Sequence, residues 1–281
     1  FMRLAGETVR RMGEGIGYFG LSTSLAMSIG PSIGLNVMKH AGFMKLTMLA
    51  LIASVLIFPV LWLSRSKEQR TTAEGAGGHS RKVEPIKASA NKVSRKLIVP
   101  VLLNALLSIT YSGLLSFLAL FGEDVHIEQV GLFFLFNAVT IILIRPISGR
   151  LFDRQGHMSV LVPAGVFVTA SMVLLSNTHT MPMLILSALL YGLGFGAIQP
   201  TIQAWMLRSA TPEQYGTVNG MFYNSTDFGV AIGAVLLGAI ASVSNYAVMY
   251  RYSAVCMAIF VLLVLMKYLT AGRRKHIEAL H

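Results

Sequence analysis

The chain has 281 residues, of which 54% are hydrophobic and only 12% are charged, and its formal net charge is +11. Soluble globular domains contain roughly 25% charged residues, so this composition excludes an ordinary soluble protein and is typical of a membrane protein. A helix crosses the ~30 Å hydrocarbon core with about 20 apolar residues. Eight segments meet that requirement and are predicted to be transmembrane helices: 15–38, 43–64, 98–121, 130–148, 159–176, 181–207, 216–243 and 248–270.

The distribution of basic residues predicts the topology. If the N-terminus is cytoplasmic, 20 of the 23 Lys and Arg lie on the cytoplasmic side, and the opposite side holds only Lys39, Lys45 and Arg251. This is the positive-inside pattern. We therefore predict a multi-pass protein of the cell membrane with both termini in the cytoplasm. The positive charge reports topology, and no nucleic-acid partner is expected.

Residues 65–97 form a hydrophilic stretch between the second and third predicted helices. It carries nine basic and three acidic residues and lacks hydrophobic periodicity. We predict a cytoplasmic linker, with room for a short amphipathic helix on the membrane surface.

An internal repeat relates the first predicted helix to the seventh. A shift of 203 residues aligns seven identical pairs without gaps, among them Gly13 with Gly216, Phe19 with Phe222 and Gly30 with Gly233. The same shift places the second helix on the eighth. Both copies enter the membrane from the same side, which predicts a parallel repeat about an axis along the membrane normal.

A short motif lies in the predicted cytoplasmic turn after segment 130–148. It reads Gly149-Arg150-Leu151-Phe152-Asp153-Arg154-Gln155-Gly156-His157. Gly149 and Gly156 are expected to let the backbone turn tightly. Asp153 can pair with a neighbouring Arg or cap a helix N-terminus of the other half. The motif resembles the signature loop of the major facilitator superfamily, although Met158 stands where a basic residue is common. The resemblance implies that Asp153 belongs to a cytoplasmic gate latch.

A second motif, Gly30-Pro31-Ser32-Ile33-Gly34, lies late in the first predicted helix. It resembles the fifth-helix motif of drug:proton antiporters, a branch of the same superfamily. Pro31 is expected to kink the helix, and Gly30 and Gly34 to give a smooth face for close packing. The resemblance implies an exporter.

Together the motifs and the repeat imply an all-α integral membrane fold of about eight transmembrane helices, similar to helices five to twelve of the superfamily. Residues 1–64 would hold the last two helices of the N-terminal half, residues 65–97 the linker, and residues 98–281 the six-helix C-terminal half. The chain opens with Phe1 rather than Met. We expect an N-terminal truncation that removes four upstream helices.

Asp227 is the one carboxylate predicted well inside a span, near the middle of segment 216–243, with Tyr223 and Asn224 on or near the same face. Because a low dielectric favours a neutral carboxyl group, Asp227 is a candidate proton or cation site, with a purely structural Asp as the alternative. Arg145 is expected to snorkel or to pair with Asp153 or Asp227 rather than to bind substrate.

Several neutral polar residues are candidates for a central cavity, although residues of this kind more often join two helices than bind a ligand: Asn104, Ser108, Tyr111, Asn137, Gln199, Gln203, Trp205 and Asn224. No metal cluster, cofactor motif or nucleophile–base pair appears at useful spacing.

The leading interpretation is a secondary transporter that exports a small organic molecule in exchange for protons, and not an enzyme. Its partners would be the substrate, protons and the lipid bilayer. Two alternatives stay open. One is a membrane-embedded lipid-modifying enzyme, for which Glu123, Asp124, His126 and Glu128 form the available cluster, and the other is an inactive transporter fragment.

Overall fold

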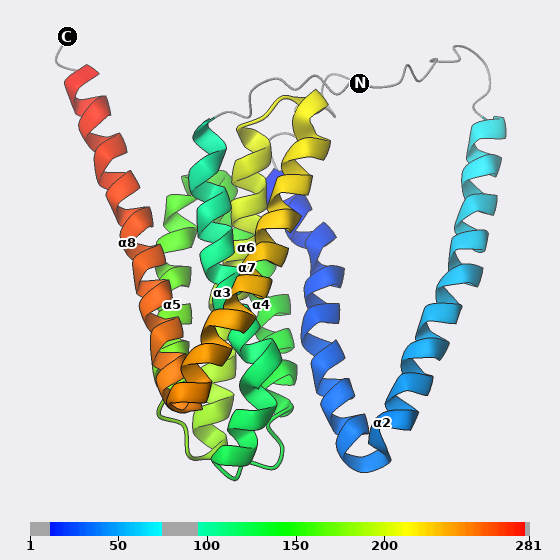
Figure 1. Cartoon of the computed structure of the whole chain (residues 1–281). Helices are drawn as coiled ribbons and strands as arrows, with labels where there is room; N and C mark the ends of the chain where they lie inside the picture. The colour runs from blue at the N-terminus through cyan, green and yellow to red at the C-terminus, as the bar shows by residue number, and fades with distance from the viewer. Residues whose placement is uncertain (1–11, 75–94, 279–281) are drawn as a thin grey trace. The chain divides into compact units, whose positions relative to one another are not determined.

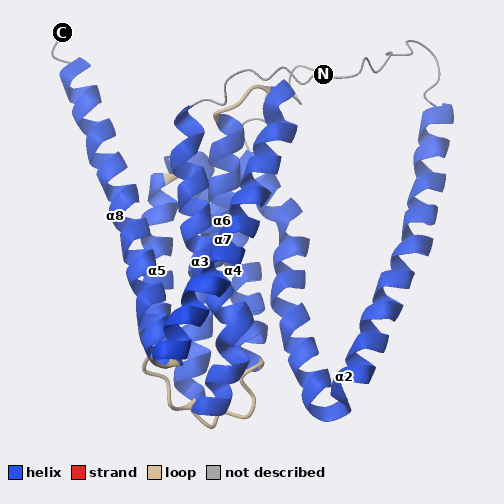
Figure 2. Cartoon of the chain, in the orientation of Figure 1, coloured by secondary structure: helices blue, strands red, loops and turns tan. Residues whose placement is uncertain are grey.

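The computed structural model describes residues 12–74 and 95–278, and in that part of the chain every regular element is a helix (Figure 2). Two short 3-10 turns, Arg95–Leu97 and Pro212–Gln214, precede α3 and α7. The α-helices are α2 (Met12–Glu74), α3 (Ile98–Asp124), α4 (Leu132–Gln155), α5 (Met158–Leu175), α6 (Met181–Arg208), α7 (Tyr215–Val243) and α8 (Tyr246–Glu278).

Within the described residues, seven helical segments are long and apolar enough to cross a membrane. Six of them, in α3 to α8, confirm the six predicted spans from residue 98 onward. The prediction for α4 was too short, because the helix continues through the signature motif to Gln155. The all-α membrane fold expected from composition and periodicity is confirmed.

The seventh segment, Leu25–Pro59, covers most of the first two predicted spans. Its 35 residues would measure about 50 Å as one straight helix, well beyond a ~30 Å hydrocarbon core. The backbone breaks at Gly42, whose φ of 79° and ψ of 169° are not helical. The break falls in the gap predicted between residues 38 and 43.

The first ten residues of the predicted linker, 65–74, are helical, because α2 continues to Glu74. Most of the predicted linker lies outside the described residues. The chain divides into two compact units: one comprises residues up to Ile33 together with those from Ser94 onward, and the other is Gly34–Val93. Our division at residues 64 and 97 into two transporter halves stays a prediction.

In the first unit, α3 to α8 lie side by side (Figure 1). The most extensive contacts join α4 to α6, α3 to α7, and α5 to both α6 and α8. The helix ends follow ordinary local rules. Gly156 ends α4 with a φ of 85°, a conformation that glycine adopts without strain. A capping box of Thr211 and Gln214 precedes α7.

Glycines on α6 let that helix pack closely between its two neighbours. A Cβ atom added at Gly192 would lie 2.7 Å from the backbone oxygen of Asn137 on α4, and one at Gly194 would lie 2.5 Å from the backbone oxygen of Ala164 on α5. Gly196 also faces α4, where the added atom would lie 3.1 Å from Cα of Ile141. The glycines therefore serve helix packing, as small residues do in membrane bundles.

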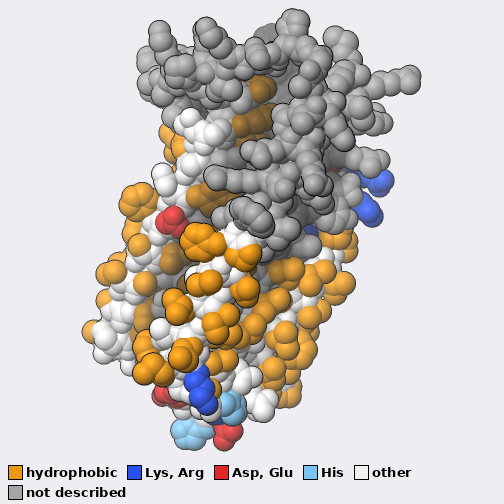
Figure 3. Space-filling model, turned by 90° about the vertical axis from the view of Figure 1, so that its right-hand side faces the viewer, with side chains coloured by type: hydrophobic (Ala, Val, Ile, Leu, Met, Phe, Trp, Pro, Cys, Tyr) orange, Lys and Arg blue, Asp and Glu red, His pale blue; other side chains and the backbone are white. Residues whose placement is uncertain are grey.

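Hydrophobic side chains predominate on the molecular surface between the helix ends, while charged and His side chains gather mostly at one end of the face in Figure 3. Large aliphatic residues are strongly exposed on each of the helices α3 to α8; Leu143, Val235 and Leu262 are examples. The described part of α2 exposes such residues as well. This reversal of the soluble-protein pattern indicates a surface that faces lipid or other apolar partners.

Candidate functional site

The signature motif lies on α4 and its C-terminal turn. Gly149 is buried inside α4, and only Gly156 has a positive φ. The prediction that both glycines form the turn was therefore wrong for Gly149, because the helix extends about two turns beyond the predicted apolar segment. Arg150 and Arg154 are exposed on this last part of α4. The turn itself consists of Gly156 and His157, after which α5 begins.

Asp153 forms an ion pair with Arg208, the last residue of α6. The Arg208 guanidinium also lies 4.3 Å from the centroid of the Phe152 ring, a cation–π geometry. This contact agrees with the expectation that Asp153 pairs with a neighbouring arginine. The partner was not identified from the sequence. A signal was present, because Arg208 is the basic residue at the end of a span predicted to finish on the same side as Asp153.

His157, Trp205 and Lys267 form a second group at the same end of the bundle. The His157 and Trp205 rings stack with centroids 4.0 Å apart, and Nζ of Lys267 lies 4.4 Å from the Trp205 ring centroid. Trp205 was a candidate for a central cavity, and that prediction was wrong, because it lies at the helix end. Burial lowers the pKa of His157 to about 4, and the positive charges of Lys267 and Arg208 act in the same direction.

This histidine makes the signature end sensitive to acid. Its pKa is lower in the folded state than the ordinary 6.5, so the unfolded state binds more protons between about pH 6.5 and 4. Stability should therefore fall as the pH drops through that window. In His157→Phe, which keeps a ring to stack on Trp205, the drop in thermal midpoint between pH 7.5 and pH 5 should be smaller. The midpoints of purified protein in detergent measure this. An equal drop in both proteins would contradict it.

Arg145 lies buried between α4 and the first part of α2. Its exposed fraction is 3%, and its Nη1 lies 2.9 Å from where a Cβ atom on Gly20 would be. The prediction that the Arg145 side chain snorkels to the surface is therefore wrong. Asp153 forms an ion pair with Arg208, and Asp227 is exposed on α7. The predicted pairing of Arg145 with one of these carboxylates stays a prediction. Gly20 matters because any side chain at that position would displace the guanidinium.

Two hydrogen bonds continue this contact along α2. The Tyr111 hydroxyl donates to the backbone oxygen of Met27 at 3.1 Å, and Nδ2 of Asn137 donates to the hydroxyl of Ser28 at 3.0 Å. Tyr111 also stacks on Phe195 with centroids 5.1 Å apart. We call the line of contacts from Gly20 to Ser28 the α2 seam. The structure thus brings Arg145, Asn137 and Tyr111 together on one side of the bundle, where sequence alone had placed them only on separate helices.

The other polar candidates join helices within the bundle. Nδ2 of Asn104 donates to the backbone oxygen of Phe222 and to the hydroxyls of Ser225 and Thr226, at 3.0, 2.7 and 2.8 Å. Nε2 of Gln203 donates to Oδ1 of Asn219 at 3.0 Å. These contacts connect α7 to α3 and to α6. Gln199 is half-buried on α6. The contacts therefore favour the interpretation that Asn104 and Gln203 join helices over the interpretation that they line a central cavity.

Asp227 lies near the middle of α7, and Tyr223, Asn224 and Asp227 are all exposed in this chain. The three residues share one face, as their spacing predicted. A carboxylate in the middle of a membrane span is costly unless it meets water or a polar partner. The face must therefore be covered by something other than lipid when the protein is assembled.

The structure does not show a break in the helix at the Gly30–Gly34 motif. The backbone of α2 remains helical at Pro31, and the break recorded inside α2 is at Gly42. A Cβ atom added at Gly30 or Gly34 would meet no described atom within 4 Å. Their role as a close-packing surface therefore stays a prediction.

The acidic cluster of the enzyme alternative lies around the C-terminal end of α3. His126 has a positive φ of 59°, and its Nδ1 lies 3.1 Å from the backbone oxygen of Glu123. Among the residues that the structure describes, no three His, Cys, Asp or Glu side chains are grouped so that they could hold a metal ion.

The bundle of long apolar helices and the signature turn with its ion pair define a multi-pass helical membrane protein. The sequence matches the Major Facilitator Superfamily over residues 2–234. The chain belongs to that superfamily.

Individual relatives agree with this assignment. The chain is 24% identical over 255 residues to an uncharacterized MFS-type transporter of Methanocaldococcus jannaschii, covering 87% of this chain and 64% of that protein. It is 31% identical over 122 residues to the bacillibactin exporter of Bacillus subtilis strain 168, covering 42% of this chain and 30% of the exporter. The crystal structure of the human organic anion transporter MFSD10 superposes with a TM-score of 0.56 at 19% identity, covering 60% of this chain and 40% of that one. The chain thus spans less than two thirds of the length of these relatives.

Proposed function

We propose that this chain is part of a secondary active transporter that exports a small organic molecule in exchange for protons by alternating access. The superfamily match over residues 2–234 is the observation that carries the proposal. An exporter among the relatives supports the direction of transport, and the Gly30–Gly34 motif supports the antiporter branch. In the proposed division, residues 1–64 supply the last two helices of one half, residues 65–97 the linker, and residues 98–281 the six helices of the other half.

The α2 seam is suited to opening and closing. It includes the hydrogen bonds of Tyr111 with Met27 and of Asn137 with Ser28, each worth about 0.5–1.5 kcal/mol net. The α3–α7 contact is tighter, because Gly229 and Gly233 on α7 bring its backbone against Ala105 and Ile109. We infer that α3 and α7 move together as one body, while α2 moves against α3 and α4.

The proposal is tested on the native polypeptide that contains this chain, reconstituted into proteoliposomes loaded with the pH dye pyranine. A panel of organic anions and organic cations is applied one at a time under an imposed pH gradient. We expect at least one compound to produce dye-reported proton flux and its own counterflow in a fixed ratio. Proton flux that no compound alters, with no compound moving, would contradict the proposal.

The proposed topology places both termini and residues 65–97 in the cytoplasm. Cysteines introduced at Ser80, which lies outside the described residues, and at Ser244, at the end of α7, provide the test. An impermeant thiol reagent should label the Ser244 position in intact cells and the Ser80 position only after the membrane is opened. The background variant has Cys256 replaced by Ala. The reverse labelling would overturn the orientation.

We expect Asp153→Asn to reduce transport strongly while leaving the protein in the membrane. The Asp153–Arg208 pair is partly exposed, and such pairs add only about 0–1 kcal/mol to stability. Its loss should therefore act on the gate rather than on folding. Transport rate and membrane abundance are measured together. The exchanged pair, Asp153→Arg with Arg208→Asp, should recover part of the lost rate, and undiminished transport in Asp153→Asn would show that the turn is only a topological signal.

A further inference from the structure

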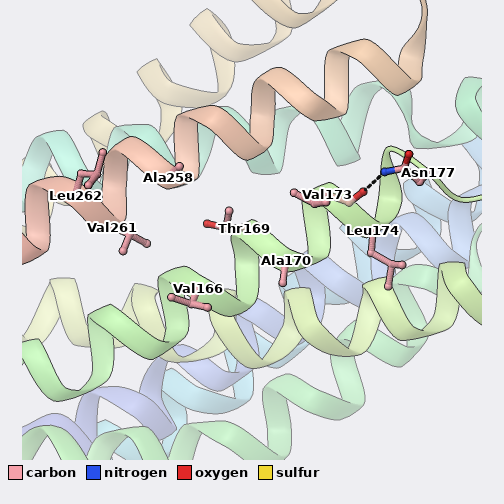
Figure 4. Close-up of a pocket in the computed structure, with 9 residues that line it drawn as sticks. All are labelled: Val166, Thr169, Ala170, Val173, Leu174, Asn177, Ala258, Val261 and Leu262. Carbon is pink, nitrogen blue, oxygen red and sulfur yellow. Dashed lines mark hydrogen bonds between the residues drawn. The ribbon is translucent and has the colours of Figure 1, made fainter.

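An elongated groove runs between α5 and α8, away from the signature turn and the α2 seam (Figure 4). Its volume is about 690 Å³, within the range of about 300–1,000 Å³ typical of small-molecule pockets. One wall is α5 from Val166 to Asn177, and the other is α8 from Ala258 to Leu262. Figure 4 shows the α5 side chains following one another along the helix axis, so the groove extends along α5.

Residue size explains why the groove exists. At one end α5 and α8 are in close contact, because a Cβ atom on Gly165 would lie 2.7 Å from Cγ2 of Val261 and 3.2 Å from the Phe260 ring. Beyond this contact the facing residues are small: Thr169 and Ala170 on α5, and Ala258 on α8. These small side chains leave an open volume at the surface between α5 and α8.

The groove offers almost nothing polar to an occupant. The Thr169 hydroxyl donates to the backbone oxygen of Gly165 at 2.8 Å, so its hydrogen bond is already made within α5. Nδ2 of Asn177 donates to the backbone oxygen of Val173 at 2.8 Å and to the Ser176 hydroxyl at 3.0 Å. Asn177 lies at one end of the groove (Figure 4). The occupant must therefore be apolar along its length, with any polar group at the Asn177 end.

The exposed residues around the groove indicate that it opens toward lipid. On α5 they are Val166, Phe167, Ala170 and Val173, besides Pro163, and all are apolar. On α8 from Val255 to Met266 they are likewise apolar: Val255, Ile259, Leu262, Leu265 and Met266. On α7, in contrast, the exposed mid-span face carries Asp227 and Asn224, a pattern suited to a polar environment. Hydrocarbon is the environment that matches the α5–α8 surface.

A cation stands beyond one end of the groove. Arg251 is exposed on α8 and precedes Ala258 by two helical turns, about 10 Å, so the two residues share a face of the helix. It lies toward the end where α5 reaches Ser176 and Asn177, because α5 and α8 run antiparallel. No ion pair of Arg251 is found among the residues that the structure describes. A guanidinium group binds a phosphate with two parallel hydrogen bonds.

We propose that the α5–α8 groove binds one acyl chain of an anionic phospholipid, and that Arg251 holds the phosphate of that lipid. The chain lies along the row from Val166 to Val173, with its terminal methyl toward Gly165, where the two helices close the groove. The lipid belongs to the leaflet on the side opposite the signature turn. The site is separate from the proposed transport pathway, and it holds whether or not the substrate is an organic anion.

The probe is phosphatidylglycerol with a photoreactive diazirine midway along one acyl chain, added to the purified chain in detergent. We expect crosslinks on α5 between Val166 and Asn177 and on α8 between Val255 and Leu262, saturating at one lipid per protein. Ala258→Phe and, as a milder filling, Ala258→Leu should reduce crosslinking at least about fivefold. Ala239→Phe, at an exposed position of α7, is the matched control and should leave it unchanged. Circular dichroism and size-exclusion profiles verify folding of each variant.

The headgroup is tested separately with Arg251→Gln. Loss of one charge-assisted contact worth about 1.5–3 kcal/mol should weaken phosphatidylglycerol crosslinking by about tenfold or more. Diacylglycerol carrying the same diazirine chain lacks the phosphate, and its crosslinking should not change. Labelling spread evenly over all exposed helix faces and unaffected by Ala258→Leu would show only bulk lipid and overturn the proposal. A disulfide between two copies of an Ala258→Cys variant would also overturn it, because a protein helix would then be the occupant.

Discussion

Gly192→Ala is expected to destabilise the bundle severely. The added methyl group would lie 2.1 Å from Oγ1 of Thr140 and 2.7 Å from the backbone oxygen of Asn137. The Thr140 hydroxyl could rotate away, but the backbone oxygen can move only if α4 and α6 separate. Overpacking of this kind costs about 1–3 kcal/mol or more. Separation of α4 from α6 would also move Asn137, which belongs to the α2 seam.

The thermal midpoint of the purified protein measures this effect. At about 2–4 °C per kcal/mol for a chain of this size, we expect Gly192→Ala to lower the midpoint by roughly 5–10 °C. The matched control is Gly220→Ala on α7, where an added Cβ atom would meet no described atom within 4 Å. Alanine favours a helix over glycine by about 0.5–1 kcal/mol, so the control should be neutral or slightly stabilising. Equal midpoints for the two variants would refute the packing argument.

Asp227→Asn is expected to abolish proton-driven export while sparing substrate binding. A proton-coupled cycle needs a group that is protonated in one conformation and ionised in another, and alternating access exposes one site to two environments. Asn keeps the volume and hydrogen-bonding capacity of Asp but cannot titrate. Uphill export driven by a pH gradient should therefore stop, while downhill exchange of substrate should continue. Both are measured on the native polypeptide in proteoliposomes.

Asn224→Ala is the control for this substitution, because Asn224 shares the exposed face of α7 but cannot carry a proton. It should change substrate affinity at most, and proton-driven uphill export should survive. If Asp227→Asn also exports uphill at the wild-type rate, Asp227 is a structural residue. Coupling would then depend on another ionisable group, and the transporter proposal itself would still stand.

Local pattern was enough to predict the helices from α3 to α8. Each is an apolar run of adequate length bounded by polar, glycine or proline residues, and membrane solvent forces such runs into helices because every backbone group must be hydrogen-bonded internally. The prediction erred where polar residues continue a helix beyond the apolar core. α4 extends through Arg150 and Asp153 to Gln155 because its backbone hydrogen bonds do not depend on side-chain hydropathy.

The sequence by itself determined the membrane class, the six described spans after residue 97, and a signature turn in which Asp153 was expected to pair with an arginine. Only the tertiary structure showed which arginine that is, that Trp205 stacks on His157, and that Asn104 joins α3 to α7. Periodicity places a residue on a helix but leaves open which neighbouring helix it faces. That choice depends on close packing between elements far apart in the chain, such as Gly192 against α4 and Gly20 against Arg145.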